Sequence, residues 1–139
     1  MVEDPLEEAD ILELVTRLDH NEVVLVVETD GEIVGWGHLR PYSSRWGYRF
    51  AGETSLFLRR THLGRGLGTM LQRALVDAAI SVNYHHLVAR IFADNRASIG
   101  LHEKVGYYMV GVQREIGFKK GDWQDIAIMG LVLTPLDDR

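Results

Sequence analysis

A glycine-rich turn that runs into a helix is the feature of this chain that most constrains its fold. Gly64, Gly66 and Gly68 lie within five residues, and the segment after them is amphipathic. Its apolar residues recur at helical spacing, at Leu67, Leu71, Ala74, Leu75, Ala78 and Val82. Glycines let successive backbone N–H groups turn toward one point, and the helix dipole adds to their attraction for an anion. The segment predicts a phosphate-binding turn before a helix, although a tight turn without a ligand is the simple alternative.

Three kinds of phosphate site can be built on such a turn. A Walker loop requires lysine and then serine or threonine after its last glycine, but Thr69 and Met70 follow Gly68. A dinucleotide-binding turn requires G-x-G-x-x-G after the first strand of a βαβ unit, whereas this chain has G-x-G-x-G after strands that read as hairpins. A turn that holds the pyrophosphate of coenzyme A fits the pattern best.

The rest of the sequence predicts alternating strands and helices. Helices are predicted at residues 4–18, 67–82 and 95–105, a hairpin at 22–39 around Asp30-Gly31, a loop at 40–47, and strands at 48–58, 86–92, 107–118 and 122–133. This order is typical of a mixed α/β sheet with helices packed on it. No linker or repeat divides residues 1–139, which predicts a single domain.

Composition excludes several classes of function. The net charge of −5 argues against general nucleic-acid binding, and the absence of cysteine excludes disulfides and thiolate chemistry. No apolar run is long enough to span a bilayer, and the acidic opening does not read as a signal peptide, so we expect a cytoplasmic protein without membrane contact. His85 and His86 lack a third ligand at a suitable spacing, so no metal site is expected.

Longer motifs carry a resemblance to a known family. The segment Leu63–Gly68 is similar to the Gln/Arg-x-x-G-x-G/A signature of the GNAT superfamily of acetyl-CoA-dependent N-acetyltransferases, with Leu63 in place of the usual first residue. From about Val24 to the C-terminus the chain resembles the phosphinothricin and methionine sulfoximine acetyltransferase branch. The matching residues include Arg45, Tyr48, Glu53, Ser55, Asn95, Ser98, Leu101, His102, Glu103, Lys104, Gly106, Tyr107, Gly111, Arg114, Gly117, Lys119, Gly121, Trp123 and Asp125.

The resemblance implies a single GNAT α/β (α+β) domain with a mixed, mostly antiparallel central sheet flanked by helices. Family members usually open with a strand and a helix before the region matched by Asp4–Leu18, so a shortened N-terminus is implied, and related enzymes are commonly dimers, so a homodimer is implied. The implied activity is transfer of acetyl from acetyl-CoA to the amino group of a small amino acid or analogue. Acetylation of protein N-termini or other amines, and a non-catalytic acyl-CoA-binding sensor, stay open as alternatives.

The resemblance also assigns the cofactor contacts. The strand before the glycine turn would pair with the pantetheine arm through its backbone. The next parallel strand, near residues 89–92, would splay away, leaving a slot and a free N–H group for the oxyanion. The implied cofactor-binding residues are Leu56, Phe57, Leu58, Leu63, Gly64, Arg65, Gly66, Leu67, Gly68, Thr69 and Asn95.

Catalytic and substrate residues follow from the same match. Glu53 lies at the family's proposed base position, where a carboxylate can take the proton that an amine must lose before it attacks. His102 occupies the place of a general-acid tyrosine in many relatives; it could act as acid or base, or only cap its helix. Arg45 is the predicted anchor for a substrate carboxylate, with Tyr48 beside it.

Overall fold

The computed structural model of the chain describes residues 20–133. Its elements in this range are β1 (Val23–Thr29), β2 (Glu32–Pro41), η1 (Trp46–Tyr48), β3 (Ala51–Leu58), η2 (Arg60–His62), α2 (Leu67–Ser81), β4 (His86–Phe92), α3 (Arg96–Val105), β5 (Tyr108–Lys119) and β6 (Asp122–Val132). The predicted strands and helices after residue 20 are therefore present. The helix predicted at residues 4–18 lies outside the described residues.

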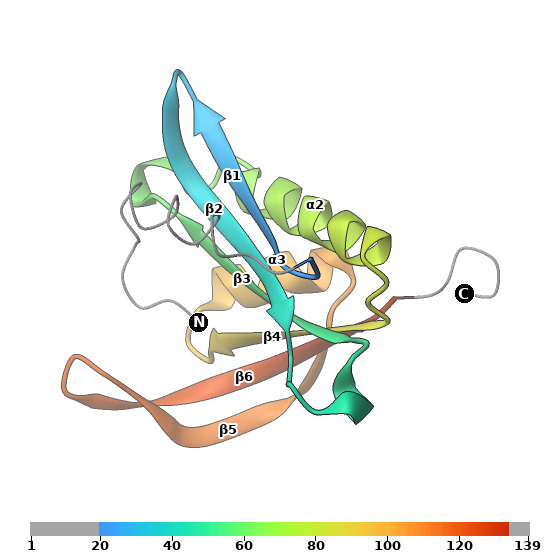
Figure 1. Ribbon diagram of the computed structural model, residues 1–139. Helices are drawn as coiled ribbons and strands as arrows, with labels where there is room; N and C mark the ends of the chain where they lie inside the picture. The colour runs from blue at the N-terminus through green and yellow to red at the C-terminus, as the bar shows by residue number, and fades with distance from the viewer. Residues whose placement is uncertain (1–19, 134–139) are drawn as a thin grey trace.

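All of these strands join one sheet in the order β1-β2-β3-β4-β6-β5 (Figure 1). The β3–β4 pair is parallel, and the other neighbouring pairs are antiparallel. This arrangement confirms the predicted mixed, mostly antiparallel sheet. The parallel pair lies at the centre of the sheet, and the helical crossover that joins its strands contains the glycine-rich turn.

Two tight turns set the register of the two outer hairpins. Asp30 and Gly31 join β1 to β2 with φ angles of 52° and 81°. Lys120 and Gly121 join β5 to β6 with φ angles of 50° and 81°. Two successive residues with positive φ are typical of the type I′ turn, whose twist matches that of the flanking strands. Both turns are therefore local features that the sequence could predict.

Helices α2 and α3 pack on the same face of the sheet (Figure 1). The buried stripe of α2 includes Leu71, Leu75 and Ala79, which lie one helical turn apart and face the sheet. Leu75 packs in a core cluster with Leu39 of β2 and Leu87 of β4, and all three are fully buried. This core fixes α2 against the centre of the sheet.

The connection between β2 and β3 differs from its prediction. The β2 strand continues through Pro41, which was expected in a loop, and β3 begins at Ala51 rather than at Tyr48. Tyr48 instead ends the short helix η1, and the Arg49 guanidinium lies 4.2 Å from the ring centroid of Trp46. Aromatic residues favour strands locally, but here they form an exposed aromatic loop.

Candidate active site

A slot opens where β3 and β4 separate. The parallel pairing runs only from Ala51↔His86 to Thr54↔Ala89. Beyond that point β3 stays with β2 up to Leu58, and β4 stays with β6 up to Phe92. The predicted splaying of these strands is therefore present, and the unpaired strand ends expose backbone groups to the gap between them.

A cavity of about 720 Å³ occupies the slot and extends over the glycine turn. It is lined by Leu56, Phe57, Leu58, His62, Leu63, Gly64, Gly66, Leu67, Gly68, Thr69, Phe92, Asn95, Ala97, Ser98, Gly100, Leu101, Lys104 and Lys119. All the residues predicted to bind the cofactor belong to this lining except Arg65, which is exposed to solvent. The structure thus brings the strand, the glycine turn and the start of α3 around one space.

The glycine turn has the geometry of an anion site. Gly64 and Gly66 both have a φ of 78°, in the left-handed region that favours glycine, and Gly66 is the N-cap of α2. At Gly68 an added Cβ atom would lie 2.5 Å from a terminal side-chain carbon of Leu101, so a larger residue here would have to displace the Leu101 side chain. The free N–H groups of the first turn of α2 therefore begin at the cavity wall, where they favour a phosphate.

Two lysines in the lining were not predicted as site residues. Lys104 extends the face of α3 that begins at Ala97 and continues through Leu101, so helical spacing could have identified it. Lys119, at the end of β5, lies with its Nζ atom 4.5 Å from the ring centroid of Phe92. Both lysines add positive charge to a cavity that already suits an anion.

A smaller pocket of about 100 Å³ adjoins the cavity at the point where the strands part. It is lined by Thr54, Ser55, Leu56, Ala89, Arg90, Ile91, Phe92, Asn95, Ser98 and His102. The two spaces share Leu56, Phe92, Asn95 and Ser98. A long ligand that lies along the large cavity would therefore place its end among the groups of this inner pocket.

His102 reaches the inner pocket from α3 and is buried. Its Nδ1 atom lies 2.7 Å from the carbonyl oxygen of Ser98, and because a carbonyl only accepts, Nδ1 carries the hydrogen. Burial lowers the pKa of His102 more than this hydrogen bond raises it. The imidazole is therefore neutral near pH 7, and its Nε2 atom keeps a lone pair that can accept a proton.

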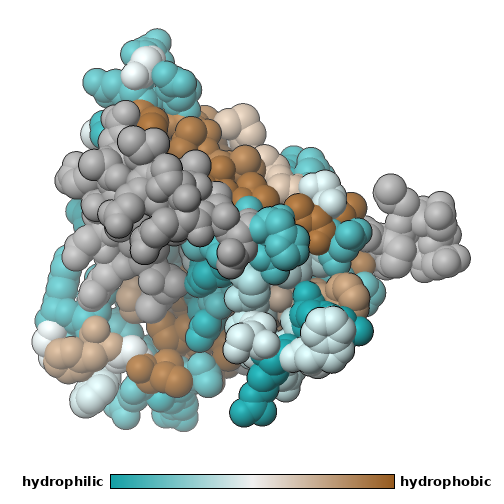
Figure 2. Space-filling view, in the orientation of Figure 1, coloured by the Kyte–Doolittle hydropathy of each residue, from teal (hydrophilic) through white to brown (hydrophobic). Residues whose placement is uncertain are grey.

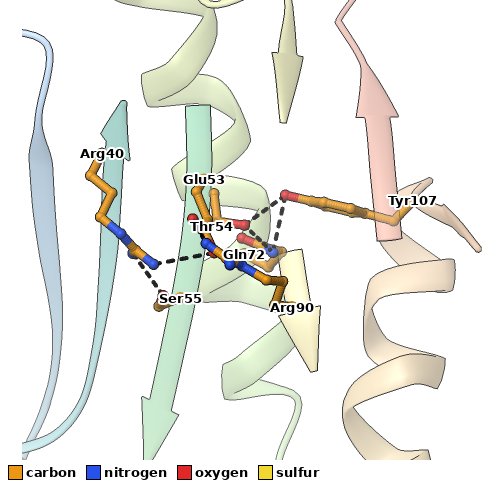
Figure 3. Close-up of polar contacts among 7 residues, drawn as sticks. All are labelled: Arg40, Glu53, Thr54, Ser55, Gln72, Arg90 and Tyr107. Atoms are coloured by element: carbon orange, nitrogen blue, oxygen red, sulfur yellow. Dashed lines mark hydrogen bonds and ion pairs between the residues drawn. The ribbon is translucent and has the colours of Figure 1, made fainter. Parts of the chain in front are cut away.

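The buried Glu53 carboxylate lies between two arginines, on the side of β3 opposite the helices (Figure 3). Arg90 donates from Nε and Nη2 to its two oxygens at 2.7 and 2.6 Å, and Arg40 Nη2 lies 3.3 Å away. Burial by itself would raise the pKa of Glu53, but the hydrogen bonds from Arg90 and the two positive charges outweigh it and lower the pKa. Glu53 is therefore ionised and hydrogen-bonded at neutral pH.

A second polar cluster lies on the helix side of β3 (Figure 3). The hydroxyls of Thr54 and Tyr107 are 2.9 Å apart, and Gln72 Nε2 donates to each of them at 3.2 Å. The ring of His102 packs edge-on against Tyr107, with centroids 5.0 Å apart. This buried cluster links β3, α2 and the short segment between α3 and β5, and it fixes the wall against which the imidazole lies.

The other predicted residues fall in two places. Asn95 caps α3, because its side chain accepts a hydrogen bond from the N–H group of Ser98 at 3.1 Å, and it also lines both the cavity and the inner pocket. Arg45 and Tyr48 lie on the exposed loop before β3 and line neither space.

Between residues 20 and 133, no three His, Asp or Glu side chains are grouped to hold a metal ion, and no helix is long and apolar enough to cross a membrane.

Comparison with known families agrees with this geometry. Residues 2–107, most of the chain, match the acetyltransferase (GNAT) family. The chain belongs to the GNAT family. An L-methionine sulfoximine/L-methionine sulfone acetyltransferase from Pseudomonas paraeruginosa is 35% identical over 116 residues, which cover 81% of this chain and 66% of that protein. This GNAT chain thus spans about two thirds of the length of that relative.

Solved GNAT structures share the fold. A phosphinothricin acetyltransferase from Sinorhizobium meliloti, in complex with acetyl-CoA, is 27% identical with a TM-score of 0.84, over 99% of this chain and 76% of that one. A ribosomal-protein-alanine N-acetyltransferase from Brucella melitensis is 33% identical with a TM-score of 0.82, over 90% of this chain and 76% of that one. These three relatives of the GNAT chain are thus named as acetyltransferases, and one of them was solved in complex with acetyl-CoA.

Proposed function

We propose that this chain transfers the acetyl group of acetyl-CoA to the amino group of a small amino acid or amino-acid analogue. The observation that carries the proposal is the meeting of the two spaces, where a cavity over a helix N-terminus ends in a pocket that holds His102 and Arg90. The names of the relatives support an amino acid as the acceptor. A cytoplasmic location is part of the same proposal.

Different segments along the slot would bind different parts of acetyl-CoA. When bound, acetyl-CoA supplies a thioester whose carbonyl carbon an amine can attack. In the proposal, the N-terminus of α2 from Gly66 to Thr69 holds the pyrophosphate. The unpaired backbone of Leu56–Leu58 aligns the pantetheine arm, and N–H groups of the separated strands face the carbonyl oxygen.

Two residues remain candidates for the base that takes the proton of the amine. Glu53, the position indicated by the resemblance, holds its proton-accepting oxygens in a bidentate pair with Arg90 and has a lowered pKa, which makes it a weak base. The His102 imidazole lines the inner pocket, and its Nε2 atom carries no hydrogen in the neutral ring. We therefore propose His102 as the base and keep Glu53 as the rival to be tested.

The proposal is tested by thiol release from acetyl-CoA with a panel of acceptors. We expect release with free amino acids and their analogues, L-methionine sulfoximine among them. Faster release with the amino terminus of a peptide would favour the first alternative, an enzyme of protein N-termini; the Brucella neighbour is named a ribosomal-protein-alanine N-acetyltransferase. Binding of acetyl-CoA without release for any amine would favour the second alternative, a sensor.

We also propose that the protein forms a homodimer through β5. This strand forms one edge of the sheet, so one side of its backbone has no partner strand among the described residues. The exposed apolar side chains of the β5–β6 hairpin include Val112, Ile116 and Phe118 of β5 and Trp123 of β6. In Figure 2, hydrophobic surface in brown shades is visible among hydrophilic residues in the region of this hairpin. An antiparallel pair of β5 strands related by a two-fold axis would satisfy the open edge and bury this surface.

The dimer predicts a clear effect of charge on the edge strand. Val112→Glu should convert the dimer to a monomer in sedimentation at micromolar concentration, because it places like charges together at a two-fold interface. Val26→Glu is the matched control, since Val26 is similarly exposed on β1 at the opposite edge. A wild-type protein that sediments as a monomer would contradict the assembly.

Substrate charge gives a further expected result. Arg45 is the single arginine in the segment between β2 and η1, which limits the positive charge available to a second anionic group on a substrate. We expect phosphinothricin, which carries two acidic groups, to be a poorer substrate than the singly anionic L-methionine sulfoximine. Steady-state kinetics on the two compounds measures this, and a higher kcat/KM for phosphinothricin would refute it.

A further inference from the structure

Arg40, Glu53 and Arg90 form an ion cluster on the face of the sheet opposite α2 and α3. A general base would not require the two arginines. Arg40, Glu53 and Arg90 come from three neighbouring strands and meet at the Glu53 carboxylate (Figure 3). Glu53 is 3% exposed, whereas the Arg90 side chain is 47% exposed. The carboxylate is therefore a buried support, and the guanidinium above it is accessible to a ligand.

The position of Arg90 is set by the end of the parallel pairing. Glu53 pairs with Val88, and Arg90 lies two residues further along β4, just past the last pair, Thr54↔Ala89. Its side chain reaches back to Glu53, so the guanidinium crosses between the strands where they begin to separate. Arg90 also lines the inner pocket, together with His102.

The hydrogen bonds to Glu53 leave part of the guanidinium free. They use the Nε hydrogen and one hydrogen of Nη2. A guanidinium has five N–H donors, so the Nη1 group and the second Nη2 hydrogen can form the two-pronged contact that carboxylates prefer. Ser55 Oγ accepts a hydrogen bond from Arg40 at 2.8 Å, which leaves its own hydrogen free to donate to an anion as well.

The charge of the cluster suits one carboxylate. Two arginines and one glutamate leave one unit of positive charge beside the pocket. Because the amino and carboxyl groups of an amino acid share one carbon atom, the group that binds the carboxylate must lie close to the reacting nitrogen. Arg90 meets this condition in the inner pocket, whereas Arg45 lines neither space.

We propose that Arg90, held in place by Glu53, binds the carboxylate of the amino-acid acceptor. This inference rests on the proposed function and deepens it by naming the group that selects amino acids over simple amines. Glu53 is then a positioning residue, because it acts through the orientation of Arg90. Arg40 supports the same carboxylate from the other side.

The test compares an amino acid with the amine that lacks only its carboxylate. Arg90→Gln should raise KM for the amino acid about 10- to 100-fold, the range expected for losing a charge-assisted pair, and leave KM for the amine unchanged. Arg90→Lys should recover part of this loss, because a lysine keeps the charge without the fork. Glu53→Gln should move KM for the amino acid in the same direction and spare the amine.

Controls separate the possible outcomes. Arg73→Gln removes the same charge on the exposed side of α2 and should leave KM unchanged for both the amino acid and the amine. Acetyl-CoA should still raise the melting temperature of each variant. Equal KM changes for amino acid and amine, or no change for either, would overturn the role of Arg90. A larger rise in KM for the amino acid in Arg45→Gln than in Arg90→Gln would also overturn that role. If the wild-type protein acetylates no amino acid, the proposed function fails, and the anchor fails with it.

Discussion

Replacing Gly66 by aspartate is expected to abolish the stabilisation of the protein by acetyl-CoA. The substitution places a negative charge at the N-cap of α2, where the pyrophosphate is proposed to bind. At about 100 times Kd, a ligand stabilises the folded state by about 2.7 kcal/mol, which raises the melting temperature of a small domain by on the order of 10 °C. Thermal unfolding with and without acetyl-CoA measures the difference.

Gly66→Asn is the matched control for this charge. Both new side chains meet open space, since no atom lies within 4 Å of an added Cβ, and both must adopt a φ of 78°. Asparagine and aspartate tolerate that conformation better than other residues with side chains, so both variants should fold. We expect Gly66→Asn to keep most of the thermal shift. Gly68→Asp should also lose it, but this site is crowded by Leu101 and tests the fold at the same time. A full shift in Gly66→Asp would show that the phosphates bind elsewhere.

Replacing His102 by asparagine is expected to lower kcat by about 10²- to 10⁴-fold, the usual contribution of a general base. Asparagine can still donate to the Ser98 carbonyl, as Nδ1 does now, but it has no basic nitrogen at the position of Nε2. The thermal shift with acetyl-CoA should persist. Unchanged turnover at neutral pH would exclude His102 as the base.

The pH dependence separates His102 from Glu53. Because burial lowers the pKa of His102, its neutral form persists below the ordinary histidine pKa, and kcat/KM for the wild type should fall only as the pH drops through this lowered value. His102→Asn should remove that acidic limb. If Glu53 is the base instead, Glu53→Gln should lower kcat by about 10²- to 10⁴-fold with either the amino acid or its carboxylate-free amine, and the loss should shrink at high pH, where more of the amine is already neutral.

The parts of the fold that the sequence predicted are those set by local interactions. Asp30-Gly31 and Lys120-Gly121 supply the positive φ angles of their turns, and the Asn95 side chain caps α3. The glycine turn could be recognised for the same reason, because Gly64 and Gly66 adopt a conformation that other residues avoid. Residues close in sequence were sufficient for these predictions.

The candidate site was only partly predictable because its inner end depends on strand register. Arg90 lies in a run that reads as an ordinary strand, and its partner Glu53 is 37 positions away. The ion pair forms only because β4 lies parallel to β3 in one particular register. Lys119 likewise meets Phe92 only after the β5–β6 hairpin folds back on β4. Neither contact can be predicted from residues that are close in sequence.

The β2–β3 connection illustrates the opposite error. Tyr48 and Phe50 favour a strand by local preference. The η1 turn and the packing of Arg49 on Trp46 and Phe50 hold this segment in a loop, so β3 begins only at Ala51. This shift matters for function, because Arg45 and Tyr48 then lie on an exposed loop rather than at the pocket. Their proposed contact with substrate stays a prediction.

The central claim is that the protein moves an acetyl group from acetyl-CoA to an amino acid. Its most direct test is mass spectrometry of the acceptor after incubation with acetyl-CoA that carries an isotopically labelled acetyl group and L-methionine sulfoximine. The account predicts labelled acetyl on the amino nitrogen, formed in step with released thiol and greatly reduced in His102→Asn. Stabilisation of the protein by acetyl-CoA with no labelled product from any amino acid or amine would contradict it.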